Sequence, residues 1–97
     1  MQPHKTIFLS GKITGDSDYV QKFNAAASAL ESKYGFTVLN PAFLPGEGFD
    51  YGAYIRICSA MLDECEMICM LLNWQESKGA SHEYNRALTL GKDILYY

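Results

Sequence analysis

The feature that most constrains the fold is a regular alternation between two hydrophobic periods along the chain. Four short runs are apolar almost throughout, and segments with helical spacing of apolar residues separate them. These runs cover residues 6–10, 36–40, 67–72 and 94–97. Apolar strands that alternate with amphipathic helices are typical of a parallel sheet covered by helices on both faces. We therefore predict an α/β fold with the element order β-α-β-α-β-α-β.

Capping and turn residues delimit the three predicted helices. Ser17 or Asp18 can begin the first helix, which Gly35 ends, while Asp50 and Ser77 can cap the second and third. Right-handed crossovers favour a doubly wound, Rossmann-like or flavodoxin-like sheet in the strand order 2-1-3-4, and we expect one domain over residues 1–97. The predicted apolar faces are Val20, Phe23, Ala27, Leu30 and Tyr34 in the first helix and Ala80, Tyr84, Ala87 and Leu88 in the third.

This topology predicts the position of a ligand site. In doubly wound sheets ligands bind at the carboxyl ends of the strands where the winding reverses, here between the first and third strands. Residues 10–18 and 73–77 form the loops that flank this crevice, and the long loop 41–50 is in position to close over it. Trp74 lies on the second flanking loop, so we expect it among the substrate contacts.

Composition and charge exclude several functions. Eight Lys and Arg against eleven Asp and Glu give a net charge of −3 without a basic cluster, so no nucleic-acid polymer is expected as partner. The longest apolar run is far shorter than the ~20 residues of a membrane span, and Met1–His4 is not typical of a signal peptide. Cys58, Cys65 and Cys69 fit no C-x-x-C pattern and suit buried thiols in a reduced cytoplasm.

The first flanking loop reads Ser10-Gly11-Lys12-Ile13-Thr14-Gly15. Its glycines allow close approach of a ligand, and its amides and Lys12 can hold polar oxygens. The spacing matches neither a dinucleotide fingerprint nor a Walker loop, so no organic cofactor is expected. A turn that merely reverses the chain explains the same residues.

The second loop leads into a helix with an acidic residue at the margin of its apolar face. Ser77 and Gly79 open this helix, and a helix N-terminus with these residues suits an anion, although ordinary capping also explains Ser77. Glu83 lies three residues after Ala80 and therefore close to the packed side. It is either a catalytic carboxylate facing the crevice or a structural one bonded to a backbone amide or to Lys12. His82 points elsewhere and has no partner at ligand spacing, so no metal site is expected.

Taken together, three motifs resemble those of the nucleoside 2-deoxyribosyltransferase superfamily. They are the opening Phe8-Leu9-Ser10-Gly11-Lys12-Ile13-Thr14-Gly15, the Leu39-Asn40-Pro41 after the second strand, and Ser77-x-Gly79-x-x-x-Glu83. The chain is similar in particular to short bacterial and phage members and to the 2′-deoxynucleoside 5′-monophosphate N-glycosidases. The resemblance spans nearly the whole chain and agrees with the predicted order of elements.

The resemblance implies a mechanism without metal or organic cofactor. Glu83 would attack the anomeric carbon of a nucleoside or nucleotide and form a glycosyl ester, which water or a second base resolves. In this superfamily the residue six positions before the glutamate meets the 5′ end of the sugar, and a serine there is typical of 5′-monophosphate substrates. Ser77 occupies that position, with Gly79 and Lys12 near it. The implied substrate contacts are Phe8, Ser10, Gly11, Lys12, Ile13, Gly15, Asn40, Asp50, Cys58, Trp74, Ser77 and Gly79.

Two positions depart from the superfamily pattern. Phe8 stands where a tyrosine hydroxyl usually positions the nucleophile, and Cys58 where an aspartate usually holds the ribose hydroxyls, with Asp50 or Asp63 as imperfect substitutes. The alternative function is therefore a non-catalytic nucleotide-binding module that kept the crevice and lost the polar sugar contacts. The resemblance also implies a homodimer or larger homo-oligomer, for which the aromatic C-terminus Leu95-Tyr96-Tyr97 is suited.

Overall fold

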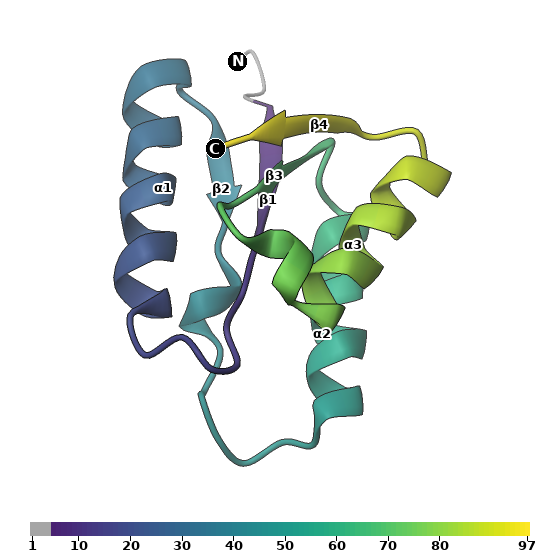
Figure 1. Cartoon of the computed structure of the whole chain (residues 1–97). Helices are drawn as coiled ribbons and strands as arrows, with labels where there is room; N and C mark the ends of the chain where they lie inside the picture. Colours follow the sequence, from purple (N-terminus) through teal and green to yellow (C-terminus); the bar gives the residue numbers. More distant parts are fainter. Residues whose placement is uncertain (1–4) are drawn as a thin grey trace.

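The predicted fold class is confirmed. The computed structural model describes residues 5–97 and contains a four-stranded parallel sheet in the order β2-β1-β3-β4 together with three α-helices (Figure 1). The strands are β1 (Thr6–Ser10), β2 (Thr37–Leu39), β3 (Met67–Met70) and β4 (Asp93–Tyr96), and the helices are α1 (Tyr19–Tyr34), α2 (Tyr51–Asp63) and α3 (Lys78–Thr89). Two short 3₁₀ helices, η1 (Pro41–Phe43) and η2 (Trp74–Glu76), follow β2 and β3.

The sheet separates two hydrophobic cores because successive side chains of a strand point to opposite faces. Ile7 and Leu9 of β1 join the core beneath α1, whereas Phe8 joins the core beneath α2 and α3. In Figure 1, α1 lies on one side of the sheet and α2 and α3 on the other. The central strands β1 and β3 are almost fully buried, as expected for a parallel sheet covered on both faces.

Capping residues set the helix boundaries largely as the sequence indicates. The Asp50 carboxylate accepts a hydrogen bond from the Ala53 amide at 2.7 Å, and the Ser77 hydroxyl accepts one from the Ala80 amide at 3.1 Å. Gly35 ends α1 with a φ of 70°, a left-handed conformation that glycine adopts without strain. The long loop 41–50 and the flanking loop 73–77 are therefore each tied to a helix N-terminus.

The expected apolar faces are wrong at three positions. Val20 is 42% exposed, Tyr34 48% and Leu88 51%. The buried face of α1 consists of Phe23, Ala26, Ala27 and Leu30, which leaves Tyr34 to stack on Phe36 at 5.0 Å. In α3 the buried side is set by Ala80, Glu83 and Ala87, and Leu88 lies about 100° further round the helix.

The second strand is shorter than residues 36–40 because Asn40 leaves it to cap η1. The Asn40 side chain accepts from the Ala42 amide at 2.9 Å and donates to the Asn24 side chain at 3.0 Å. The third strand likewise ends at Met70, and Leu72 is 81% exposed. Within residues 5–97, no helix has the length and apolar character that would let it cross a membrane.

Candidate functional site

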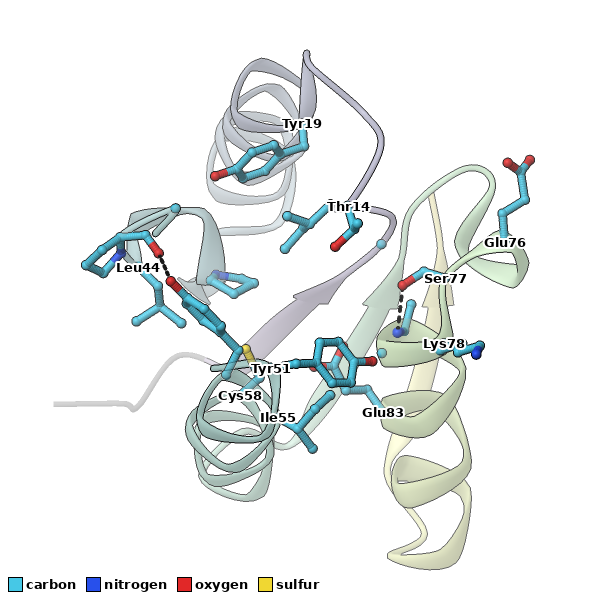
Figure 2. Close-up of a pocket in the computed structure, with 18 residues that line it drawn as sticks. Thr14, Tyr19, Leu44, Tyr51, Ile55, Cys58, Glu76, Ser77, Lys78 and Glu83 are labelled. Atoms are coloured by element: carbon cyan, nitrogen blue, oxygen red, sulfur yellow. Dashed lines mark hydrogen bonds between the residues drawn. The ribbon is translucent and has the colours of Figure 1, made fainter. Parts of the chain in front are cut away.

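A cavity of about 700 Å³ opens at the carboxyl ends of β1 and β3, where the topology predicts a ligand site. Its walls come from the loop after β1, the loop between β2 and α2, the first two turns of α2, and the start of α3. Figure 2 shows Tyr51, Ile55 and Cys58 of α2 across this space from Glu83 of α3 and from Ser77, which caps α3. The fold thus brings together residues far apart in the sequence.

Glu83 is the buried carboxyl of this cavity. Its side chain comes from the buried side of α3, is only 8% exposed, and lines the cavity. The Ser10 hydroxyl, at the end of β1, donates a hydrogen bond of 2.6 Å to Glu83 Oε1. Of the two structural partners considered from sequence, neither a backbone amide nor Lys12 holds this carboxyl. Its partner is Ser10, and Lys12 pairs with Glu76.

Burial raises the pKa of Glu83 to about 7, and the hydrogen bond from Ser10 opposes part of that rise. A carboxylate loses hydration when it is buried, and a donor that stabilises the charged form partly restores it. At neutral pH the Glu83 side chain is therefore a mixture of carboxylic acid and carboxylate. Carboxyl groups with such a pKa, set in a cavity, are typical of acid–base and nucleophilic sites.

Cys58 lines the cavity beside Glu83 but carries a neutral thiol. Burial raises the pKa of Cys58 to about 12, and the negative charge of Glu83 adds to the rise. Because the thiolate is the reactive form of cysteine, Cys58 contributes an apolar, unreactive wall. No three His, Cys, Asp or Glu side chains gather as metal ligands anywhere in residues 5–97.

The start of α3 forms a polar corner of the cavity. Ser77 caps the helix, and Gly79 lies between it and the Tyr51 hydroxyl, which would be 3.5 Å from a β-carbon added at Gly79. A side chain at Gly79 would thus fill space between α2 and α3 without a severe clash. At the rim, Lys12 Nζ lies 2.9 Å from Glu76 Oε1 in an ion pair that is partly open to solvent.

Six of the residues predicted from sequence line the cavity, and several of the others have structural roles. The six are Gly11, Ile13, Cys58, Ser77, Gly79 and Glu83. Gly11 is also required by packing, because a β-carbon there would lie 3.0 Å from Leu71 Cβ. Gly15 has a φ of +84° and serves the turn after β1.

Phe8, Asn40, Asp50 and Trp74 are not among the residues that line the cavity. Phe8 is fully buried in the core beneath α2 and α3, and Trp74 stacks on Tyr84 at 4.4 Å. Asn40 and Asp50 use their side chains to cap η1 and α2.

The sequence analysis did not predict the aromatic and apolar residues of the cavity wall. Tyr19, Tyr51 and Tyr54 line the cavity together with Leu44 and Pro45, and the Tyr54 hydroxyl donates to the Pro45 carbonyl at 2.6 Å. A signal was available, because a helix capped by Asp50 starts at the same edge of the sheet. Its first turn therefore had to face the crevice. An apolar wall opposite a few polar groups is the usual composition of a small-molecule pocket.

The fold and cavity define a class: an α/β protein with a small-molecule pocket at the reversal point of a parallel sheet and a buried carboxyl in its wall. The chain belongs to the family described as "Domain of unknown function (DUF4406)", whose model matches residues 5–96. A search of curated proteins finds no match to this chain.

Proposed function

We propose that this protein cleaves the N-glycosidic bond of a nucleoside 5′-monophosphate, with Glu83 as nucleophile. The proposal includes membership in the nucleoside 2-deoxyribosyltransferase superfamily, by resemblance of its motifs. The observation that carries it is Glu83 itself: a carboxyl 8% exposed that lines a 700 Å³ cavity and has one oxygen held by Ser10.

The chemistry requires a carboxylate beside the anomeric carbon. In the first step a Glu83 oxygen bonds to C1′, and the electron pair of the C1′–N bond leaves with the base, which takes a proton from solvent. In the second step water bonds to C1′, the ester bond to Glu83 breaks, and a proton returns to solvent. The sum is base plus sugar phosphate from nucleotide plus water. A second base in place of water would give transfer.

A 5′-phosphate suits the polar corner at the start of α3. The first amides of α3, the Ser77 hydroxyl and Lys12 at the rim are the available partners for an anion there. The wall opposite is formed by Tyr51, Tyr54 and Leu44, which suits a flat aromatic base. Substrate polarity thus matches the distribution of polar and apolar side chains around the cavity.

We further propose that the protein works as a homo-oligomer in the cytoplasm. Tyr96 in the edge strand β4 and Tyr97 directly after it are 60% and 56% exposed, and Leu72, in the segment after β3, is 81% exposed. Exposed aromatic residues at a sheet edge favour contact with another copy. The free thiols of Cys58, Cys65 and Cys69 are compatible with a reducing compartment.

The test is a panel of nucleosides and deoxynucleosides with their 5′-monophosphates, in which released base is measured by chromatography. We expect base to be released from a monophosphate. The rate should rise as the pH increases through the pKa of Glu83, about 7, because the carboxylate is the reactive form. Glu83→Ala should reduce the rate at least ~1000-fold, the scale of removing a nucleophile. Glu64→Ala, at the exposed end of α2, is the matched control and should retain activity.

The alternative is a nucleotide-binding module without catalysis. It is favoured by Phe8 and Cys58, which present a phenyl ring and a neutral thiol where the superfamily carries a hydroxyl and a carboxylate. Tight binding of a monophosphate with no base release, unchanged in Glu83→Ala, would support the module. Absence of both binding and release across the panel would contradict both functions.

A further inference from the structure

The hydroxyl of Ser10 occupies a special position next to the candidate nucleophile. Phe8 and Ser10 lie two residues apart on β1 and therefore point to the same face of the sheet, towards α2 and α3. Phe8 is buried in the core there, and Ser10, at the end of the strand, meets Glu83. The hydroxyl that Phe8 lacks is thus present one side chain further along the same face.

The backbone of Ser10 is held by its pairing with β3. It is 1% exposed, it pairs with Met70 in the register of β1 and β3, and its carbonyl accepts a hydrogen bond from the Leu71 amide at 2.8 Å. Ser10 is the last residue of a central, buried strand, so its backbone is anchored to the sheet. The Glu83 oxygen that accepts its proton is consequently fixed relative to the sheet.

The two oxygens of Glu83 have different surroundings. The hydrogen bond that the described residues give to this carboxyl is on Oε1. Every fully buried side-chain oxygen or nitrogen in residues 5–97 has a hydrogen-bond partner. Because Oε2 has none among these residues, it is not fully buried, and we infer that it is the oxygen in contact with the cavity that Glu83 lines. When a carboxylate acts as a nucleophile, one oxygen forms the new bond. The other can then stay hydrogen-bonded to a donor during the reaction, which is the arrangement of Oε2 and Oε1 here.

We propose that Ser10 is the positioning residue of this site: its hydroxyl fixes Oε1 of Glu83 and leaves Oε2 to form the bond to the sugar carbon. The inference rests on the proposed function for the second half of that statement. Its first half concerns the free protein and can be measured without any substrate.

The other groups that face Glu83 do not offer the same contact. From α2, Cys58 presents a neutral thiol and Tyr51 a hydroxyl close to Gly79. Glu76, at the end of η2, and Lys78, the first residue of α3, line the polar corner, and Glu76 is paired with Lys12. The titration of Glu83 therefore depends mainly on its burial and on the Ser10 hydroxyl.

The experiment compares Ser10→Ala, Ser10→Thr and Ser10→Cys in the full chain, with Thr6→Ala as matched control. Thr6 lies on the same face of β1 at the opposite end, where its hydroxyl accepts a hydrogen bond from the Glu66 amide. The side-chain carboxyl carbon of glutamate is labelled with ¹³C, the Glu83 signal is assigned by its loss in Glu83→Gln, and its pH titration is followed by NMR. Base release from the best substrate of the panel gives kcat and KM.

Ser10→Ala should move the Glu83 midpoint upward from about 7 by about one pH unit, because the carboxylate loses its donor. It should lower kcat ~10- to 100-fold with KM within about twofold, and the acid limb of the rate profile should move with the titration. Ser10→Thr should restore the Glu83 midpoint and kcat to their wild-type values, and Thr6→Ala should change neither the midpoint nor kcat.

An unchanged or lowered midpoint in Ser10→Ala would overturn the inference, as would a raised KM at constant kcat, which would make Ser10 a substrate contact. If Ser10→Ala does not fold, Ser10→Cys decides, because its weaker donor must raise the midpoint by a smaller amount. If the wild-type chain releases no base from any substrate, the proposed function fails. The titration series alone then decides whether Ser10 holds Glu83.

Discussion

The face of the sheet beneath α1 and the face beneath α2 and α3 both bury apolar cores, yet they differ in what lies among the apolar side chains. Beneath α1, Ile7, Leu9 and Phe23 pack with small residues of the helix. Beneath α2 and α3, Phe8 and Leu62 pack in the same way, but Ser10 and Glu83 also lie buried on that face, where the core meets the cavity. Among the described residues, Glu83 is the one buried residue that carries an ionisable acidic or basic side chain, apart from the cysteine thiols.

This difference separates stability from chemistry. A core of hydrocarbon side chains stabilises the fold at every pH, whereas a buried carboxyl opposes folding whenever it is ionised. The chain thus keeps one face for packing and places its reactive group on the other. Three substitutions test that division, in order of decreasing effect.

The largest effect is expected from Phe23→Ala beneath α1. Phe23 is 1% exposed, so its truncation should lower the free energy of unfolding by about 3–5 kcal/mol through lost burial and a residual cavity. Denaturant unfolding measures this loss. Val20→Ala on the same helix, at a position 42% exposed, should cost under ~1 kcal/mol. The folded fraction of Phe23→Ala should still titrate Glu83 near pH 7, and a displaced midpoint would show that the two faces are not independent.

The second effect is a gain of stability from Glu83→Gln. The pKa of Glu83 is raised from 4.5 to about 7, so between these values the folded protein binds more protons than the unfolded chain, and its stability falls as pH rises. The amide removes that cost. We expect thermal unfolding to show a gain of about 1–3 kcal/mol at pH 8 and almost none at pH 4.5. A gain of equal size at both pH values would contradict burial of an ionisable carboxyl as its cause.

The smallest effect is expected at the rim, from Glu76→Gln. This substitution releases Lys12 from an ion pair that is half open to water, so the pair itself adds little to stability. A freed Lys12 should bind a nucleoside 5′-monophosphate about three- to fivefold tighter in low salt and leave the affinity for the nucleoside unchanged. Calorimetric titration measures both affinities. Glu64→Gln changes the net charge equally at a distant exposed site and should leave the affinity for the monophosphate unchanged. An equal gain of affinity in Glu64→Gln, or tighter nucleoside binding in Glu76→Gln, would contradict Lys12 as a phosphate contact.

The fold and the central carboxyl could be predicted from the sequence because both depend on short-range patterns. The alternation of apolar runs and amphipathic segments fixes a parallel sheet, and right-handed crossovers leave few strand orders. Glu83 stands out because its distance from Ala80 and Ala87 places it on the packed side of α3. Each inference needs only spacing within one element or the order of elements.

The partners of the polar residues could not be predicted, because they depend on the positions of side chains from distant segments. Nothing in the sequence indicates that Ser10 rather than Lys12 meets Glu83, or that Lys12 turns outward to Glu76. Asn40 and Asp50 were expected at the substrate from the resemblance, Asn40 as part of the Leu39-Asn40-Pro41 motif and Asp50 as a substitute for the missing aspartate. Their side chains accept hydrogen bonds from nearby backbone amides, a common use of short polar side chains that the resemblance does not indicate.

The contact between Ser10 and Glu83 also bears on how the site forms during folding. The two residues are separated by 73 positions, so their hydrogen bond closes a loop that contains α1, β2, α2 and β3. Closing a loop of that length has a large entropic cost, and parallel sheets form such contacts late. The hydrogen bond can exist only once β1 and β3 are paired and α3 has docked on them. The protonation of Glu83 is therefore a reporter of the completed native sheet, and a chain that has collapsed without pairing its central strands contains no site.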